Sequence, residues 1–196
     1  MKNAIRVTII LAAWAAGAAA VTFIDERFNN GCPPPGWTTQ NNGRTSFNLG
    51  SGGPAGPYAT ASATISSMTS PAWAYLDSTP FNITQGQTLY YRFQYDMYRS
   101  PSLGSAWGTF YIIVTVGGQI LTSWSRNSTT GEWTEYSGYY VPLYDATVVA
   151  RWRFDCAVSS MGGQSGRFSI DTCQIGTESF AAVAPASLGR VRAVFR

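Results

Sequence analysis

The chain has 196 residues, of which 12% are charged and 14% aromatic, and its formal net charge of +3 includes no histidine. Charged side chains make up about 25% of an average soluble domain, so this low-charge, aromatic-rich composition is typical of an extracellular β-protein. The missing histidine excludes Ser-His and Cys-His catalytic pairs and histidine-ligated zinc or copper sites, and the body of the chain lacks the basic cluster that nucleic acids require.

The first twenty residues have the layout of an export signal. A basic start with Lys2 and Arg6 precedes an apolar run over residues 7–20, and the small residues Ala18 and Ala20 fit a cleavage site. Because this run is shorter than the roughly 18–20 apolar residues that span a bilayer, a retained anchor is the less favoured interpretation. We therefore predict a signal peptide over residues 1–20 and a secreted or cell-surface protein without stable membrane insertion.

The predicted domain opens with residues 22–37, which combine alternating apolar residues with a proline-rich segment. We expect a first strand and an entry turn here, with Trp37 packed under the turn in the core. A long loop rich in Gly, Pro and Asn follows over residues 41–57, with one short strand expected near Phe47. Residues 89–98 then place an apolar side chain at every second position, which predicts a half-buried strand.

The second half of the domain keeps this period of two. Two strands that meet at Gly117-Gly118 predict a hairpin, and further strands follow over residues 147–155 and 166–175. In the strand over residues 147–155, the residues expected to face water are Arg151, Arg153 and Asp155. Strands separated by Gly, Pro, Asn and Ser turns, without an amphipathic helix after the signal, predict an all-β sandwich over residues 21–178.

The last stretch, residues 179–196, differs from the rest in composition. It contains Arg190, Arg192 and Arg196 and only apolar or small polar residues otherwise. Such an end resembles the short basic tails of secreted bacterial proteins, which predicts a sorting or attachment signal. A disordered terminus, common for basic ends, is the alternative.

Three segments, in their order along the chain, carry a resemblance to a known family. In the opening IDERFNNGCPPPGW the matching residues are Glu26, Phe28, Pro34, Pro35, Gly36 and Trp37. The second segment is SPAWAYLDSTPFNITQGQTLYYRFQYDMY, and the third combines VVARWRFD with GRFSIDTCQI and its Ile170-Asp171 step. Over about residues 22–176 the chain resembles choice-of-anchor J domains, also called cleaved-adhesin or MAM-like domains, of secreted bacterial proteins. The resemblance implies a concanavalin A-like jelly roll of two antiparallel sheets that serves adhesion or glycan binding more often than catalysis.

The resemblance also implies a structural calcium ion near the first strand and the closing aspartate. The candidate ligands are Glu26, Asn29 and Asp171, with Asp25 beside them. Calcium takes six to eight oxygens from carboxylates, amides and carbonyls. The family has a second acid where this chain has Asn29, which lowers the charge of the site. The alternative is that these acids are ordinary solvent-facing strand residues.

The three cysteines, Cys32, Cys156 and Cys173, allow at most one internal disulfide in an exported chain. A hairpin that turns near residues 164–165 would place Cys156 opposite Cys173, at a separation that permits a bond. Cys32 is the competing partner. The alternative is that Cys173 is a small buried apolar residue.

Aromatic residues near predicted loops and strand ends are the candidates for ligand binding: Trp107, Trp124, Trp133, Tyr136, Tyr139 and Tyr140. A sugar stacks its apolar face on such rings, while neighbouring polar groups bond its hydroxyls. The alternative is a place in the core, where we expect Trp73 and Trp152. Glu132 and Glu135 are the close acidic pair beside these aromatics. A glycosidase needs two carboxylates about 5–10 Å apart, but residues three apart in a strand point to opposite faces.

These observations predict an exported, non-enzymatic binding module for a carbohydrate or another adhesion ligand. The partner is then a glycan or a surface protein, and calcium is the one cofactor considered. A structural or self-assembling surface protein without a small ligand is the alternative. A glycoside hydrolase of concanavalin-like fold comes third.

Overall fold

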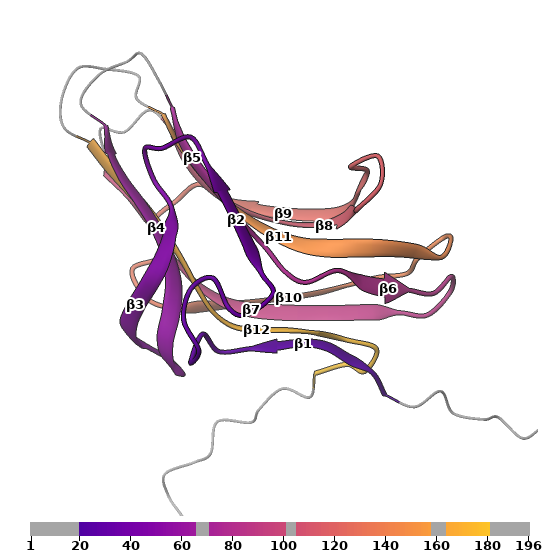
Figure 1. Ribbon diagram of the computed structural model, residues 1–196. Coiled ribbons are helices and arrows are strands. Elements are labelled where there is room, and N and C mark those ends of the chain that lie inside the picture. Colours follow the sequence, from indigo (N-terminus) through magenta and orange to yellow (C-terminus); the bar gives the residue numbers. More distant parts are fainter. Residues whose placement is uncertain (1–19, 66–70, 101–104, 158–163, 181–196) are drawn as a thin grey trace, which may run out of the picture.

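The computed structural model describes residues 20–65, 71–100, 105–157 and 164–180 (Figure 1). These residues contain no helix and form twelve strands in two antiparallel six-stranded sheets, which confirms the predicted two-sheet jelly-roll sandwich. Most of the predicted signal peptide (1–20) and of the basic tail (179–196) lies outside the described residues. Within the described part, no helix is long and apolar enough to cross a membrane.

Each sheet mixes strands from the two halves of the chain. Sheet A has the order β10 (Thr134–Tyr140), β7 (Leu89–Arg99), β12 (Gln164–Gly176), β4 (Gly56–Ile65) and β3 (Phe47–Gly53), with β1 (Thr22–Glu26) paired to the C-terminal part of β12. Sheet B has the order β2 (Thr38–Asn41), β5 (Ala72–Asp77), β11 (Ala146–Ala157), β8 (Ser105–Val114) and β9 (Ile120–Arg126), with β6 (Phe81–Ile83) paired to β11.

The core lies between the sheets because the central strands bury every second side chain, as their sequence predicts. Trp152 of β11 is fully buried, and its ring centroid lies 5.2 Å from that of Phe110 in β8. Trp37, from the entry turn, stacks on Trp152 with a centroid distance of 5.4 Å. The turn after β1 therefore closes one part of the core, as expected for Trp37.

The two hairpins that the sequence predicts have different outcomes. Gly117-Gly118 does connect β8 to β9, and both glycines have positive φ angles, 87° and 67°. The prediction of a hairpin between the last two strands is wrong, because β11 belongs to sheet B and β12 to sheet A. Cys156 and Cys173 are therefore not opposite each other on paired strands, and they are free thiols, as is Cys32. Cys173 is fully buried, in agreement with the alternative interpretation.

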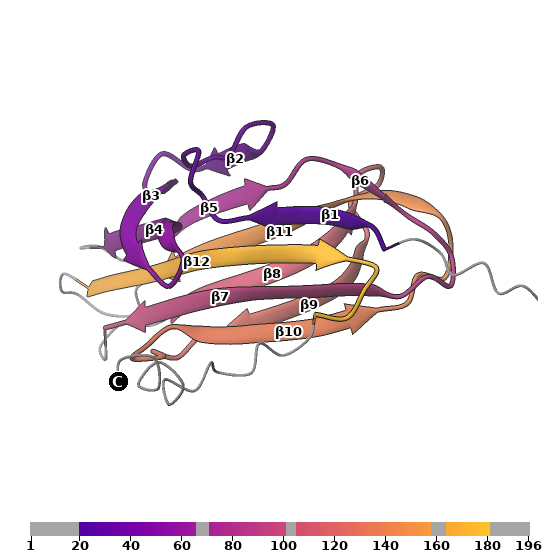
Figure 2. The same cartoon turned by 90° about the horizontal axis from the view of Figure 1, so that it is seen from below.

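Both layers curve in the same direction (Figure 1). The outer face of sheet B lies on the inner side of this curve, and the outer face of sheet A lies on the other side. Figure 2 shows β1, β12, β7 and β10 side by side in sheet A. The sandwich thus presents one concave and one convex sheet face to its surroundings.

Candidate binding face

The six aromatic residues that the sequence suggests for ligand binding do not form one site. Three of them occupy inward positions in their strands or against the core. Trp124 of β9 and Tyr136 of β10 stack with ring centroids 5.0 Å apart, and Tyr140 packs against the same core. Trp124 also lies 5.4 Å from buried Phe93. Strand alternation directs these side chains between the sheets, so they are core residues.

The other three aromatic candidates lie on opposite outer faces. Trp133 meets Tyr58 edge-on, with centroids 5.1 Å apart, beside sheet A. Tyr139 is 68% exposed and points outward from β10 of the same sheet. Trp107 is 39% exposed on the outer face of sheet B. Of the three, Trp107 lies in a row with half-buried aromatic and charged side chains on the outer face of sheet B.

Strand register arranges these side chains in rows across β5, β11 and β8 on the outer face of sheet B. The first row is Trp73, Asp155 and Trp107, the second is Tyr75, Arg153 and Thr109, and the third is Asp77, Arg151 and Tyr111. These residues are called the platform below. Strands lie about 4.8 Å apart and alternate residues about 6.8 Å apart, so the platform covers about 10 by 14 Å.

Tyr75 is the centre of the contacts within the platform. Its ring stacks on that of Trp73 with a centroid distance of 4.8 Å. The guanidinium groups of Arg151 and Arg153 lie over the same ring, 4.6 and 5.1 Å from its centroid. Cation–π contacts of this kind contribute about 0.5–2 kcal/mol each. They hold the aromatic and guanidinium planes in a fixed mutual arrangement.

Each platform arginine is also paired with a carboxylate. Arg151 donates from Nε and Nη2 to the two oxygens of Asp77, both at 2.7 Å. Arg153 donates from Nε and Nη2 to the two oxygens of Asp155, the second bond being 2.6 Å long. These hydrogen bonds raise the pKa of both arginines, although burial acts in the opposite direction. A guanidinium has five N–H donors, so each arginine keeps donors for a ligand.

A hollow of about 270 Å³ adjoins the third row of the platform. Tyr75, Tyr111, Arg151 and Arg153 line it together with apolar residues such as Ile120 of β9. The strands that carry Tyr75, Tyr111 and Arg151 form the concave side of the sandwich (Figure 1). Concave sites with aromatic and apolar walls and a few fixed polar groups are typical of ligand binding.

Trp73 differs most clearly from the sequence-based expectation, which assigns it to the core. In β5 the fully buried side chains are those of Ala72, Ala74 and Leu76, so Trp73 and Tyr75 point outward. The period of two in this short strand was the signal that could have identified them. The large indole of Trp73 suggested burial, but the stack on Tyr75 shields it on the outer face instead.

Two of the candidate calcium ligands, Glu26 and Asp171, lie near the buried thiol of Cys173. Glu26 is the register partner of Cys173, and Asp171 precedes it in β12. Asp171 is fully buried, accepts N–H bonds from Ala55 (2.9 Å) and Thr172 (2.7 Å), and forms none of the ion pairs found in the described chain. Asn29 is exposed.

A buried carboxylate without a cationic partner fits a metal ion, but the side chains at this place are few. Within the described ranges no group of three or more His, Cys, Asp or Glu side chains is placed to hold a metal ion. The Glu26 carboxylate already accepts the N–H of Phe28. Because calcium takes six to eight oxygens, most of its ligands here would be backbone carbonyls. Calcium at Glu26, Asn29 and Asp171 therefore stays a prediction.

Glu132 and Glu135, the acidic pair considered for catalysis, line two different hollows beside sheet A. Glu135 points outward from β10, whereas Glu132 lies in the loop before this strand. The carboxylates of the platform, Asp77 and Asp155, are each engaged by an arginine. The geometry of the described residues thus gives no support to a glycosidase mechanism at Glu132 and Glu135.

Solved structures of low sequence identity resemble this chain, two of them with a TM-score of at least 0.50. The K1 cleaved-adhesin domain of Lys-gingipain from Porphyromonas gingivalis W83 matches with a TM-score of 0.51 and 12% identity, over 83% of this chain and 100% of that one. The K3 cleaved-adhesin domain of the same protein matches with a TM-score of 0.50 and 12% identity, over 79% of this chain and 99% of that one. The xylan-binding domain CBM22-1 of Paenibacillus barcinonensis Xyn10C has a TM-score of 0.49 at 11% identity, over 84% of this chain and 100% of that one.

No protein-family model matches the sequence, and no curated protein matches it either. The two adhesin-domain similarities therefore show the sandwich fold and leave the function to be argued from the residues of this chain.

Proposed function

We propose that the chain is an exported, non-catalytic module that binds carbohydrate through the platform on sheet B. The observation that carries this proposal is the arrangement around Tyr75, where aromatic planes and paired guanidinium groups share one exposed, concave face. Sugars combine apolar C–H faces with hydroxyl edges. Flat rings cover the former, and fixed N–H donors bond the latter.

The rigidity of the platform supports recognition of a ligand from solution. Binding normally costs about 0.5–1.5 kcal/mol for each long side chain that becomes fixed. Here Arg151 and Arg153 are already held by Asp77, Asp155 and the ring of Tyr75. The same pairs keep the two carboxylates from acting as a free general acid and base, which favours binding over hydrolysis.

The test is binding of the purified full chain to a glycan array, followed by affinity electrophoresis in gels that contain the polysaccharides retained. Trp107→Ala and Tyr111→Ala each remove an outward ring from the platform. We expect each to weaken retention about tenfold, which corresponds to about 1.4 kcal/mol.

The matched control is Tyr139→Ala, which removes an exposed ring from the opposite face of the sandwich. We expect its retention to equal that of the unsubstituted chain. Absence of glycan binding would contradict the proposal and favour the structural, self-assembling protein. Equal losses in Tyr139→Ala and Trp107→Ala would place the site elsewhere.

A further inference from the structure

Strand β10 forms one edge of sheet A. In the described part of the chain it pairs with β7 alone, over Thr134–Tyr140. The alternate N–H and C=O groups on its other side face away from the sheet, and such an edge is a template for another strand. Glu135, Ser137 and Tyr139 point outward from it, and Tyr136 and Tyr140 point toward the core.

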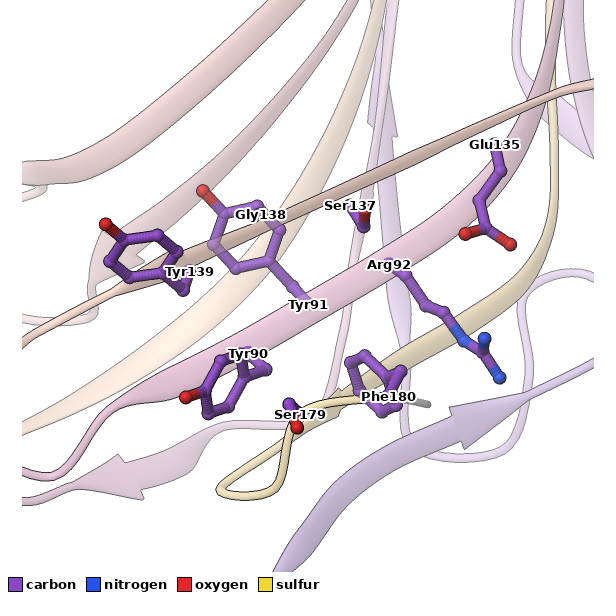
Figure 3. A pocket seen from close by; sticks show the side chains of 9 residues that line it. All are labelled: Tyr90, Tyr91, Arg92, Glu135, Ser137, Gly138, Tyr139, Ser179 and Phe180. Carbon is purple, nitrogen blue, oxygen red and sulfur yellow. The ribbon is translucent and has the colours of Figure 1, made fainter. Parts of the chain in front are cut away.

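The described chain ends beside this edge. After β12 it turns onto the outer face of sheet A, where the guanidinium of Arg92 lies 5.0 Å from the ring centroid of Phe180. Ser179 and Phe180 form one wall of a hollow of about 310 Å³, whose opposite wall includes Ser137, Gly138 and Tyr139 of β10. Figure 3 shows Phe180 next to Arg92 of β7, with Glu135 and Tyr139 of β10 on the other side of β7. The described chain therefore ends next to the C-terminal half of β10.

The sequence after Phe180 contains a strand pattern. In RVRAVFR, residues 190–196, the apolar Val191, Ala193 and Phe195 alternate with positions that carry three arginines. The nine residues 181–189 reach up to about 30 Å when extended, and the seven residues of β10 span about 23 Å. The connection is therefore long enough for residues 190–196 to lie along the whole edge.

We propose that residues 190–196 add to β10 as an antiparallel outer strand of sheet A. A strand that enters at Tyr139 and runs toward Thr134 has the antiparallel direction. Its apolar face continues the inner surface next to Tyr136 and Tyr140. Its arginines lie on the outer face, where Glu135 provides the opposite charge. The tail then covers the edge of the sheet that would otherwise be open to aggregation.

Hydrogen–deuterium exchange of the full chain tests this proposal. The double variant Val191→Asp/Phe195→Asp places charge on the apolar face of the added strand. We expect the amides of residues 134–140 that face away from β7 to exchange at least about tenfold faster in this variant. Exchange in β9, an edge strand of sheet B, is expected to stay unchanged, which shows that the sandwich remains folded.

The matched control is Ala182→Asp/Ala184→Asp, which adds the same charge to the tail outside residues 190–196. It should exchange in β10 as the unsubstituted chain does. Glu135→Lys should also speed exchange in β10, while Glu132→Lys, in the loop before the strand, should not. Equal β10 exchange in Val191→Asp/Phe195→Asp and the unsubstituted chain would overturn the proposal. Protection that rises with protein concentration would overturn it too, because the added strand would then come from a second copy.

Discussion

Burial controls the chemistry of all three thiols at the scale of single residues. It is the main cause that raises the pKa of Cys32 from 9.0 to about 12 and that of Cys156 to about 11. The nearby Glu26 carboxylate adds to the increase at Cys32. Cys173 is fully buried, and its pKa is also raised, first by burial and then by Asp171 and Glu26. A thiolate is the reactive form of cysteine, and a raised pKa lowers the thiolate population at neutral pH.

We therefore expect the native chain to react slowly with Ellman's reagent at pH 8 and to yield three thiols after unfolding in guanidinium without reductant. A yield of one thiol would show that two cysteines are bonded to each other.

The same pKa shifts make the free energy of unfolding depend on pH. The unfolded chain loses the Cys32 proton near pH 9 and the folded chain near pH 12, so the free energy of unfolding falls as the pH rises through this range.

The proposed calcium site belongs to the scale of elements, because it needs β1, β12 and the turn at Ala55 together. Asp171 links β12 to this turn, because its carboxylate accepts a hydrogen bond from the N–H of Ala55. A ligand bound by the native state alone stabilises it by about 2.7 kcal/mol at a hundredfold excess over Kd. We expect millimolar calcium to raise the Tm of the full chain above its value in EDTA, and Asp171→Asn to abolish the rise.

The control for this titration is Asp25→Asn, which alters an exposed carboxylate of the same first strand. Its side chain accepts a hydrogen bond from Gln174 and none from Ala55 or Thr172, which bond Asp171. The calcium response should persist in this variant. An unchanged Tm of the unsubstituted chain would remove calcium from this fold.

The elements also show why the sequence predicts the strands better than the site. The period of two correctly placed Arg151, Arg153 and Asp155 on an outward face of β11. It could not show that β5 and β8 flank this strand, because pairing between strands far apart in the chain leaves no local pattern. Only that pairing brings Tyr75 and Tyr111 to the arginines. The failed hairpin of Cys156 and Cys173 has the same cause, since equal distances from a turn do not determine which sheet a strand joins.

At the scale of the whole molecule, the platform and the β10 edge depend on how closely the two sheets pack. Gly108 of β8, in sheet B, faces Phe168 of β12, in sheet A, and an added Cβ at Gly108 would overlap the Phe168 ring. The glycine is therefore needed for the distance between sheets. Overpacking of a core typically costs about 1–3 kcal/mol, so we expect Gly108→Ala to lower the free energy of unfolding in urea by this amount.

Phe168→Leu tests the cause of that loss. Alone it leaves a small cavity beside Gly108 and should also destabilise the chain. Combined with Gly108→Ala it makes room for the new methyl group, so the two changes together should cost less than their sum by about 1 kcal/mol. Additive losses would mean that Gly108→Ala acts through the backbone of β8. In that case the spacing of the sheets would be set elsewhere, and the aromatic contacts of Trp152 with Trp37 and Phe110 would be the next place to test.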